Sequence, residues 1–338
     1  MKIHGLGINI ADDYVDGRQG RLSDRLRLAE RVGYTVAELG ITGLNVIING
    51  ELIRERVEAI QQAMAPFDLR YSVHAPGRSN LAFCHDPPLE YRVLQACLRF
   101  CHAIGAGVLV YHSGLQALEA ARSGTAPLPS DDELARGAAR EVAALRRLAP
   151  LAADLGVTIG MENGDPHLWE YAVLARTGKS AEQLVRYHER LRTAAIVAQV
   201  ERVDHPSVGI TLDLAHLHLA THALGEDYLE AISVAGPWVR HLHINDNFGK
   251  LDRGFDAERD RLPYGEADLH LPPGWGAIPF VEAFERLREY EGDIVLEIKE
   301  RYLDHLGEAL DNTSRILGEG GHEVVGLAGR EGRVDTDR

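Results

Sequence analysis

The sequence predicts a single α/β domain in which eight parallel strands, each followed by a helix, close into a barrel. Short apolar segments rich in β-branched residues alternate with longer segments of helical period, eight times in succession. No linker interrupts this alternation between residues 1 and 316, the range that we assign to the barrel. Residues 9–14, after the first expected strand, also lack the glycine-rich phosphate turn typical of an open doubly wound sheet.

The expected strands are short apolar runs that several Gly, Pro and polar residues separate from the helices. In chain order they span 3–9 (IHGLGIN), 35–39 (TVAEL), 69–74 (LRYSVH), 107–112 (GVLVYH), 157–162 (VTIGME), 208–213 (VGITLD), 239–244 (VRHLHI) and 293–298 (DIVLEI).

The expected helices alternate with these strands and show apolar residues at a spacing of three and four. They span 22–32, 52–65, 89–104, 131–155, 181–202, 225–235, 279–290 and 302–317. Two further segments stand apart from the repeat. Residues 163–207 are too long for a plain crossover and could form a lid or an oligomer contact, so a homo-oligomer is possible. Residues 317–338 are rich in Gly and charge and are expected to form a flexible tail.

Composition and charge narrow the possible partners. The chain is 45% hydrophobic and 26% charged, and its formal net charge of −15 at pH 7 argues against broad attraction to nucleic acid. The three cysteines, Cys84, Cys97 and Cys101, have no disulfide-framework spacing, and we expect buried thiols. No apolar run is long enough to span a bilayer, so we expect a cytoplasmic protein without a membrane partner.

Six consecutive expected strands carry a metal-ligand type of residue at or beside their C-terminal end. These residues are His74, His112, Glu162, Asp213, His243 and Glu297. In a barrel such strand ends converge around one axis, and reactive groups lie at this face. His216 in the segment DLAH and the pair Asp268 and His270 in EADLHLPPGWG add three donors, the first on a turn and the others in a loop.

Imidazole and carboxylate donors suit divalent ions, zinc above all and also manganese. Nine donors exceed the three protein ligands that one catalytic zinc typically takes. The sequence therefore predicts two to three ions.

These motifs resemble the xylose isomerase-like barrel superfamily, and most closely its endonuclease IV branch, over about residues 1–316. The resemblance implies three zinc sites. His74, His112 and Glu162 would form the first; Glu162, Asp213, His243 and Glu297 the second; His216, Asp268 and His270 the third. The segments HLHIND and DLAH also resemble those of sugar isomerases and epimerases.

The sequence departs from a DNA-repair enzyme in the loop PGRSNLAF after His74. That family inserts a bulky side chain into the duplex there, whereas this loop offers Arg78 and no aromatic residue before Phe83. The chain also lacks a basic stripe with interleaved aromatic residues. A small anionic or sugar substrate is therefore favoured over DNA, and an abasic-site endonuclease remains the second alternative.

Hydrolysis of a phosphoester or phosphodiester of a small sugar-like substrate is the function that we expect first. Three divalent ions would outweigh four carboxylates and make the mouth cationic. Glu162 would bridge ions and orient water, while Lys299, Arg78 and Trp275 are candidates for contacts with the substrate. His241 shares a face with His243 but lies one layer deeper, where we expect a supporting role.

The alternative function uses the same scaffold for sugar isomerisation or epimerisation. Here Glu162, Asp213, His243 and Glu297 would hold one ion, the two glutamates would move a proton beside a carbonyl, and His216 would contact the substrate. A third hypothesis is a barrel that binds metal or sugar without catalysis. It would require that the catalytic carboxylates be missing, and none is.

Overall fold

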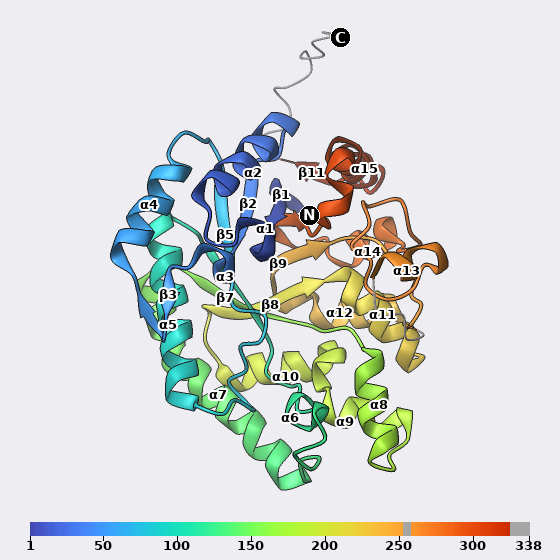
Figure 1. Ribbon diagram of the computed structural model, residues 1–338. Helices are drawn as coiled ribbons and strands as arrows, with labels where there is room; N and C mark the ends of the chain where they lie inside the picture. The colour runs from blue at the N-terminus through green and yellow to red at the C-terminus, as the bar shows by residue number, and fades with distance from the viewer. Residues whose placement is uncertain (253–257, 325–338) are drawn as a thin grey trace.

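Eight parallel strands close into a barrel, and helices surround it (Figure 1). This computed structural model describes residues 1–252 and 258–324. The barrel strands are β1 (Lys2–Ile10), β2 (Val36–Gly40), β5 (Arg70–His74), β6 (Val108–His112), β7 (Thr158–Glu162), β8 (Val208–Asp213), β9 (Val239–Ile244) and β10 (Glu291–Leu296). Pairing of β10 with β1 closes the barrel, so the predicted fold is confirmed.

The strand register places metal-ligand residues of neighbouring strands side by side at the C-terminal end of the barrel. His112 of β6 is paired with Glu162 of β7, and Asp213 of β8 is paired with His243 of β9. The barrel strands are largely buried, and they pack with the surrounding helices into one large core. This packing fixes the position of the strand-end site residues, because each lies at the end of a buried strand or directly after it.

The outer layer consists of one principal helix after each strand. These helices are α2 (Gln19–Val32), α4 (Arg54–Met64), α5 (Pro87–Ile104), α7 (Asp131–Asp154), α10 (Thr193–Val203), α12 (Tyr228–Ala235), α14 (Phe280–Arg286) and α15 (Leu306–Glu319). Local sequence explains several starts. Ser130 and Glu133 form a capping box at α7, and Asp86 caps α5 ahead of Pro87.

Further elements occupy the connections. They are α1 (Asp12–Val15), α3 (Ile41–Leu44), the hairpin β3 (Ile47–Ile48) and β4 (Glu51–Leu52), α6 (Glu119–Arg122), α8 (Leu168–Arg176), α9 (Leu184–Tyr187), α11 (Leu214–Leu224) and α13 (Glu258–Arg261). Short 3-10 turns span Ala181–Gln183, Glu189–Leu191, Gly236–Trp238, Leu262–Tyr264 and Glu300–His305. None of the helices in the described residues is long and apolar enough to cross a membrane.

The helix expected at 181–202 is wrong in its first half. Residues 181–192 form short turns, because the chain pairs there with the connection after β6. Ala117 N donates to Tyr187 O, and Glu189 N donates to Leu115 O. The regular helix α10 begins only at Thr193. The segment that departs from the barrel repeat is therefore 163–192, and 193–207 returns to the repeat.

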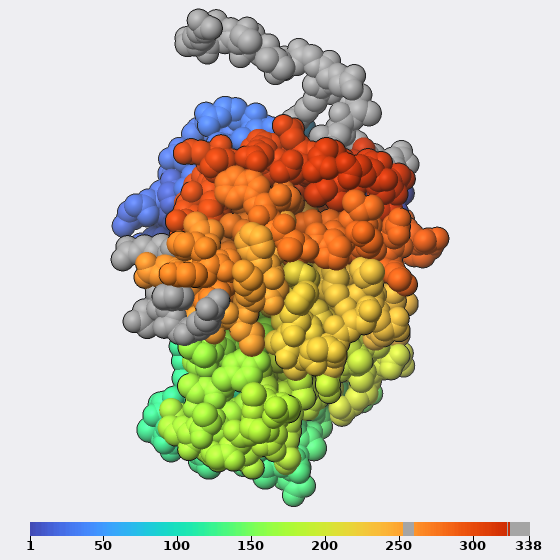
Figure 2. Space-filling view, turned by 90° about the vertical axis from the view of Figure 1, so that its right-hand side faces the viewer, coloured from blue at the N-terminus to red at the C-terminus, as the bar shows by residue number. Residues whose placement is uncertain are grey.

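This inserted segment packs against the barrel mouth through a small core of its own. Buried apolar side chains of α8, α9 and α6 gather there, including Leu174, Leu184 and Ala121. In Figure 1 these three helices lie together beyond α10, and Figure 2 shows the yellow-green surface of the insertion at the lower end of the molecule.

The helix expected at 225–235 and the tail expected from 317 also differ in their bounds. Gly225, with φ 66°, ends α11, and Asp227 caps the later start of α12. Helix α15 continues to Glu319, and strand β11 (Glu323–Val324) pairs with β1. The remainder of the expected tail, 325–338, lies outside the described residues.

Candidate metal centre

All nine predicted ligands meet at the C-terminal mouth of the barrel. Their donor atoms form three adjacent groups, in each of which the atoms lie within 4.8 Å of one another. The groups are His74, His112 and Glu162; Glu162, Asp213, His243 and Glu297; and His216, Asp268 and His270. The structure thus brings together residues that the sequence separates by more than 200 positions. Their binding of metal stays a prediction.

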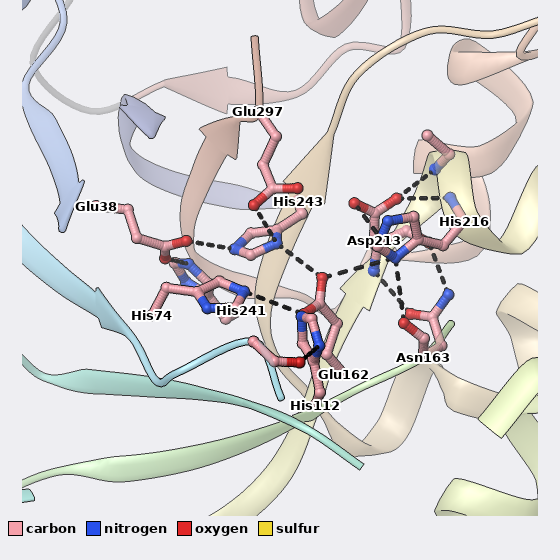
Figure 3. Close-up of polar contacts among 12 residues, drawn as sticks. Glu38, His74, His112, Glu162, Asn163, Asp213, His216, His241, His243 and Glu297 are labelled. Atoms are coloured by element: carbon pink, nitrogen blue, oxygen red, sulfur yellow. Dashed lines mark hydrogen bonds and ion pairs between the residues drawn. The ribbon is translucent and has the colours of Figure 1, made fainter. Parts of the chain in front are cut away.

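Glu162 is the residue shared by two of these groups (Figure 3). It is fully buried, its Oε2 lies 3.0 Å from His112 Nε2, and its Oε1 lies 3.1 Å from His243 Nδ1. Burial raises the pKa of this carboxyl, but His112 and His243 outweigh the burial and hold the pKa well below its usual range. Glu162 is therefore an anion that offers one oxygen to each side.

Four of the five histidines are anchored through Nδ1 to a backbone carbonyl. The pairs are His74 with Ala75 O at 2.7 Å, His112 with Gly77 O at 2.9 Å, His216 with Asn163 O at 3.2 Å and His270 with Glu297 O at 2.9 Å. A carbonyl only accepts, so Nδ1 carries the proton of the neutral ring and Nε2 keeps its lone pair. Each ring therefore presents Nε2 as a ligand atom.

His243 is oriented the other way by Glu38, a residue that the sequence analysis missed. Glu38 on β2 is buried, and its Oε1 lies 2.9 Å from His243 Nε2, which leaves Nδ1 to face Glu162 and Glu297. Its Oε2 contacts His241 and accepts from Ser72 Oγ. A carboxylate behind a ligand histidine fixes the ring and raises its basicity. The polar residue inside the apolar run TVAEL was the available indication.

Asp213 caps α11, so the segment DLAH forms the first turn of a helix rather than the expected turn. Its Oδ1 accepts from the backbone N–H groups of Ala215 and His216, both at 2.7 Å. Its Oδ2 is buried without a hydrogen-bond partner among the described residues. Burial, together with the charges of Glu297 and Glu162, raises the Asp213 pKa to about 7.

The loop that carries Asp268 and His270 is held in an unfavourable backbone conformation. Ala267 and His270 have φ values of 62° and 47°, in the left-handed region that non-glycine residues rarely adopt. Asp246 organises the loop, because its carboxylate accepts from the backbone N–H groups of Gly274, Gly276 and Ile278. Asp268 then contacts His270 and lies 3.6 Å from His216 Nε2.

The donor set fits divalent cations. Burial alone would disfavour a group of four carboxylates in one mouth, and a cation offsets that cost. Asp213 Oδ2 and Asp268 Oδ1 are both buried without a hydrogen-bond partner among the described residues, so each retains a lone pair for a ligand. Imidazole with carboxylate is the donor chemistry of zinc and manganese sites.

A cavity of about 1060 Å³ opens beside the donor groups, and His112, His216 and Asp268 line it. Of the three residues predicted to contact a substrate, Arg78 and Lys299 line this cavity, and Arg78 lies 3.7 Å from Glu119. Trp275 does not line it. Its Nε1 donates to Glu308, and its ring packs against Tyr302.

The model of a known family covers most of this chain. The model described as the xylose isomerase-like TIM barrel matches residues 26–317. The chain belongs to this family. The resemblance noted in the sequence is therefore confirmed. A curated relative, an uncharacterized protein of Methanocaldococcus jannaschii, is 29% identical over 157 residues, and the match spans 46% of this chain and 41% of that protein.

Solved structures of the xylose isomerase-like fold resemble this chain over almost its whole length. A D-tagatose 3-epimerase-like protein matches with a TM-score of 0.65 and 16% identity, covering 94% of this chain and 98% of its own. D-psicose 3-epimerase of Clostridium cellulolyticum H10 matches with 0.62 and 16%, covering 93% and 99%. The IolI protein with a bound zinc atom matches with 0.59 and 17%, covering 94% and 97%. At these identities the likeness establishes the fold.

Proposed function

We propose that this chain is a metal-dependent enzyme acting on a small sugar or sugar derivative. The observation that carries the proposal is the arrangement of the five mouth histidines. Four have Nδ1 hydrogen-bonded to a backbone carbonyl, His243 has Nε2 at 2.9 Å from Glu38, and the other ring nitrogen of each faces the acidic groups. Histidines oriented in this way are preorganised as metal ligands. Zinc is the first candidate ion, with manganese as the alternative.

Sugar isomerisation or epimerisation is the first candidate activity. The fold is similar to that of proteins named as 3-epimerases, and none of the relatives described above is named as a hydrolase. The central group of Glu162, Asp213, His243 and Glu297 supplies four ligands for one ion and includes two glutamates. The expectation of hydrolysis as the first function therefore gives way to the isomerase or epimerase alternative.

In this proposed mechanism the two glutamates move a proton at the carbon beside the substrate carbonyl. A divalent ion in the central group would polarise that carbonyl. Glu162 is held as an anion by His112 and His243, so it is in the form that accepts a proton. Glu297, which is 8% exposed, would return a proton from its own side of the group. His216 lines the cavity and would hold a substrate hydroxyl.

Hydrolysis of a phosphoester is the second candidate, and the two flanking groups favour it. The epimerase mechanism needs only the central group and gives no metal-binding role to His74, His112, Asp268 or His270. Yet His74 and His112 form one further donor group with Glu162, and Asp268 and His270 form another with His216. Adjacent ions that share a carboxylate are typical of enzymes that stabilise both the attacking and the leaving oxygen of a displacement reaction.

Metal counting separates the two candidates. We expect two to three ions per chain from protein purified without chelator if hydrolysis is the function, and one if it is epimerisation. Replacing Asp268 and His270 together with Ala should then remove about one equivalent and most activity in the first case only. Asp304→Ala with His305→Ala is a matched control, because this exposed pair lies outside the donor groups.

Two activity assays complete the test. Exchange of the proton beside the carbonyl of a ketose with deuterium from solvent reports epimerisation, and release of product from a small phosphoester reports hydrolysis. Metal-loaded protein that catalyses neither reaction on any ketose or phosphoester tested would contradict the proposed function.

A further inference from the structure

Arg190 is a buried cation in the inserted segment, at the wall of the cavity. It is 8% exposed and lines the same cavity as His112 and His216. Its Nε donates to His188 Nε2 at 2.8 Å. A buried guanidinium is costly unless its donors are used, and this one bond uses one of the five N–H groups.

His188 and Glu170 hold Arg190 in place from behind. Because Arg190 Nε always carries hydrogen, His188 Nε2 must accept, and the proton of the neutral ring sits on Nδ1. That nitrogen lies 2.8 Å from Glu170 Oε1. Glu170 is itself fixed, since it accepts from His167 N and from Gln116 Nε2. Both His188 and Glu170 are fully buried, and the row Glu170, His188 and Arg190 ends at the cavity.

The outer end of Arg190 has no protein partner among the described residues. No carboxylate there lies within ion-pair distance of its guanidinium, and its Nη atoms donate to no described group. Ser113, which lines the same cavity, is also buried with its Oγ unpaired in this part of the chain. Arg190 and Ser113 thus line one cavity, each with a side-chain donor that no described acceptor uses.

Gly164 shows how close Arg190 lies to the candidate metal centre. Gly164 follows Glu162 by two residues, and its N–H donates to Arg190 O at 3.0 Å. A Cβ added at Gly164 would lie 2.5 Å from Arg190 Nε and 2.8 Å from His188 Nε2. The absence of a side chain at Gly164 therefore lets Arg190 pack directly on the backbone that follows β7.

We propose that Arg190 and Ser113 form an anion subsite that binds a phosphate group of the substrate, so that the substrate is a phosphorylated sugar. The planar fork of a guanidinium matches two oxygens of a phosphate, and a third oxygen can accept from a hydroxyl. The inference rests on the proposed function, because it names the class of sugar that the metal centre acts on. Glu170 and His188 are positioning residues in this subsite.

Binding measurements on metal-loaded protein test the subsite without requiring turnover. D-fructose 6-phosphate and D-fructose serve as probes in calorimetry with wild type, Arg190→Met and Arg190→Lys. We expect Arg190→Met to weaken binding of the phosphorylated probe roughly 10- to 100-fold, because charged hydrogen bonds to the phosphate are lost. Binding of D-fructose should be unchanged. Arg190→Lys, which keeps the charge but not the fork, should fall between them.

Arg122→Met is the matched control, because Arg122 also lines the cavity but stacks on Trp169 and lies 3.7 Å from Glu119. It should bind both probes as wild type does. Metal content and circular dichroism establish that each variant is folded and loaded. If Arg190→Met does not fold, Arg190→Lys alone decides.

Three results would overturn the subsite. The first is that wild type binds the phosphorylated probe no more tightly than D-fructose. The second is that the folded Arg190 variants bind the phosphorylated probe as wild type does, which would place the phosphate on the metal ions. The third is that binding of D-galacturonate depends on Arg190 and binding of the phosphorylated probe does not, which would make the subsite one for carboxylates. Failure of the proposed function looks different, since Arg190-dependent binding then persists without turnover.

Discussion

At the scale of single residues, the ligand atoms at the barrel mouth depend on which ring nitrogen of each histidine contacts a neighbouring protein group. His74, His112, His216 and His270 are anchored through Nδ1 by carbonyls, whereas His243 Nε2 lies 2.9 Å from Glu38 Oε1. Removing Glu38 would free the His243 ring and weaken one group, whereas the four carbonyl anchors belong to the backbone and no side-chain substitution removes them.

Glu162→Gln should abolish turnover under either candidate activity and lower the metal content by about one equivalent. The amide cannot serve as a charged ligand between His112 and His243, and it cannot accept the proton of the substrate. Metal analysis and activity assays check this result. Glu141→Gln, at a buried carboxyl outside the donor groups, should keep its metal. Wild-type turnover in a fully metallated Glu162→Gln protein would contradict both mechanisms.

The metal-free protein should lose stability as the pH rises from 6.5 to about 9. Burial lowers the His74 pKa, but hydrogen bonding to Glu162 and its charge outweigh the burial and raise the pKa from 6.5 to about 9. Because the pKa of His74 is higher in the folded state, protonated His74 stabilises the fold fully below pH 6.5. This stabilisation, about 1 to 3 kcal/mol, is lost as the pH rises through about 9. Urea unfolding across this range measures it. Metal-loaded protein should not show the loss, since a bound ion needs His74 unprotonated.

At the scale of elements, the loop after β9 brings Asp268 and His270 to the mouth through strained backbone. Ala267 and His270 are in the left-handed region, and the carboxylate of Asp246 holds the following turn by three backbone N–H groups. The loop therefore depends on a residue that is itself no ligand.

Asp246→Ala should lower the free energy of unfolding by roughly 2 kcal/mol, because backbone donors lose their acceptor. It should also weaken metal binding by the His216, Asp268 and His270 group roughly tenfold, since the loop no longer holds two of its ligands in place. Denaturant unfolding and metal titration measure these effects. Asp227→Ala removes the cap of α12 and should cost about 1 kcal/mol without changing metal binding. Equal metal affinity in both variants would contradict this role of Asp246.

At the scale of the whole molecule, an acidic chain surrounds a mouth that would become cationic with its ions. The net charge of −15 opposes the approach of a polyanion, whereas a small anion can enter the cavity and reach Arg190. A small anion would therefore be favoured over a polyanion as a substrate.

Binding of a 20-base-pair duplex that contains an abasic site should therefore be weak at physiological salt, and cleavage slow compared with turnover of a small phosphoester. Phosphate contacts by Lys and Arg supply most of the affinity for DNA, and this chain has more Asp and Glu than Lys and Arg. Electrophoretic shift and nicking assays measure both. Efficient nicking would make the abasic-site endonuclease, the second alternative, the leading function.

Sequence patterns predicted the barrel well because its strands are regular and buried. All eight strands were placed within about two residues, and 208–213 and 239–244 match the observed bounds. The insertion was predicted less well. Its residues 181–192 have helical periodicity, but tertiary pairing with the connection after β6 overrides that preference.

The sequence by itself determined the closed barrel and the six strand-end donors at its mouth, because strand alternation forces residues at successive strand ends toward one axis. Only the tertiary structure decided which nitrogen each histidine presents, that Glu38 orients His243, and that Arg190 reaches the cavity. These features arise from contacts between segments far apart in the chain, such as Glu38 with His243 and Gly164 with Arg190. Spacing along one segment does not encode such contacts, since they depend on how the whole barrel packs.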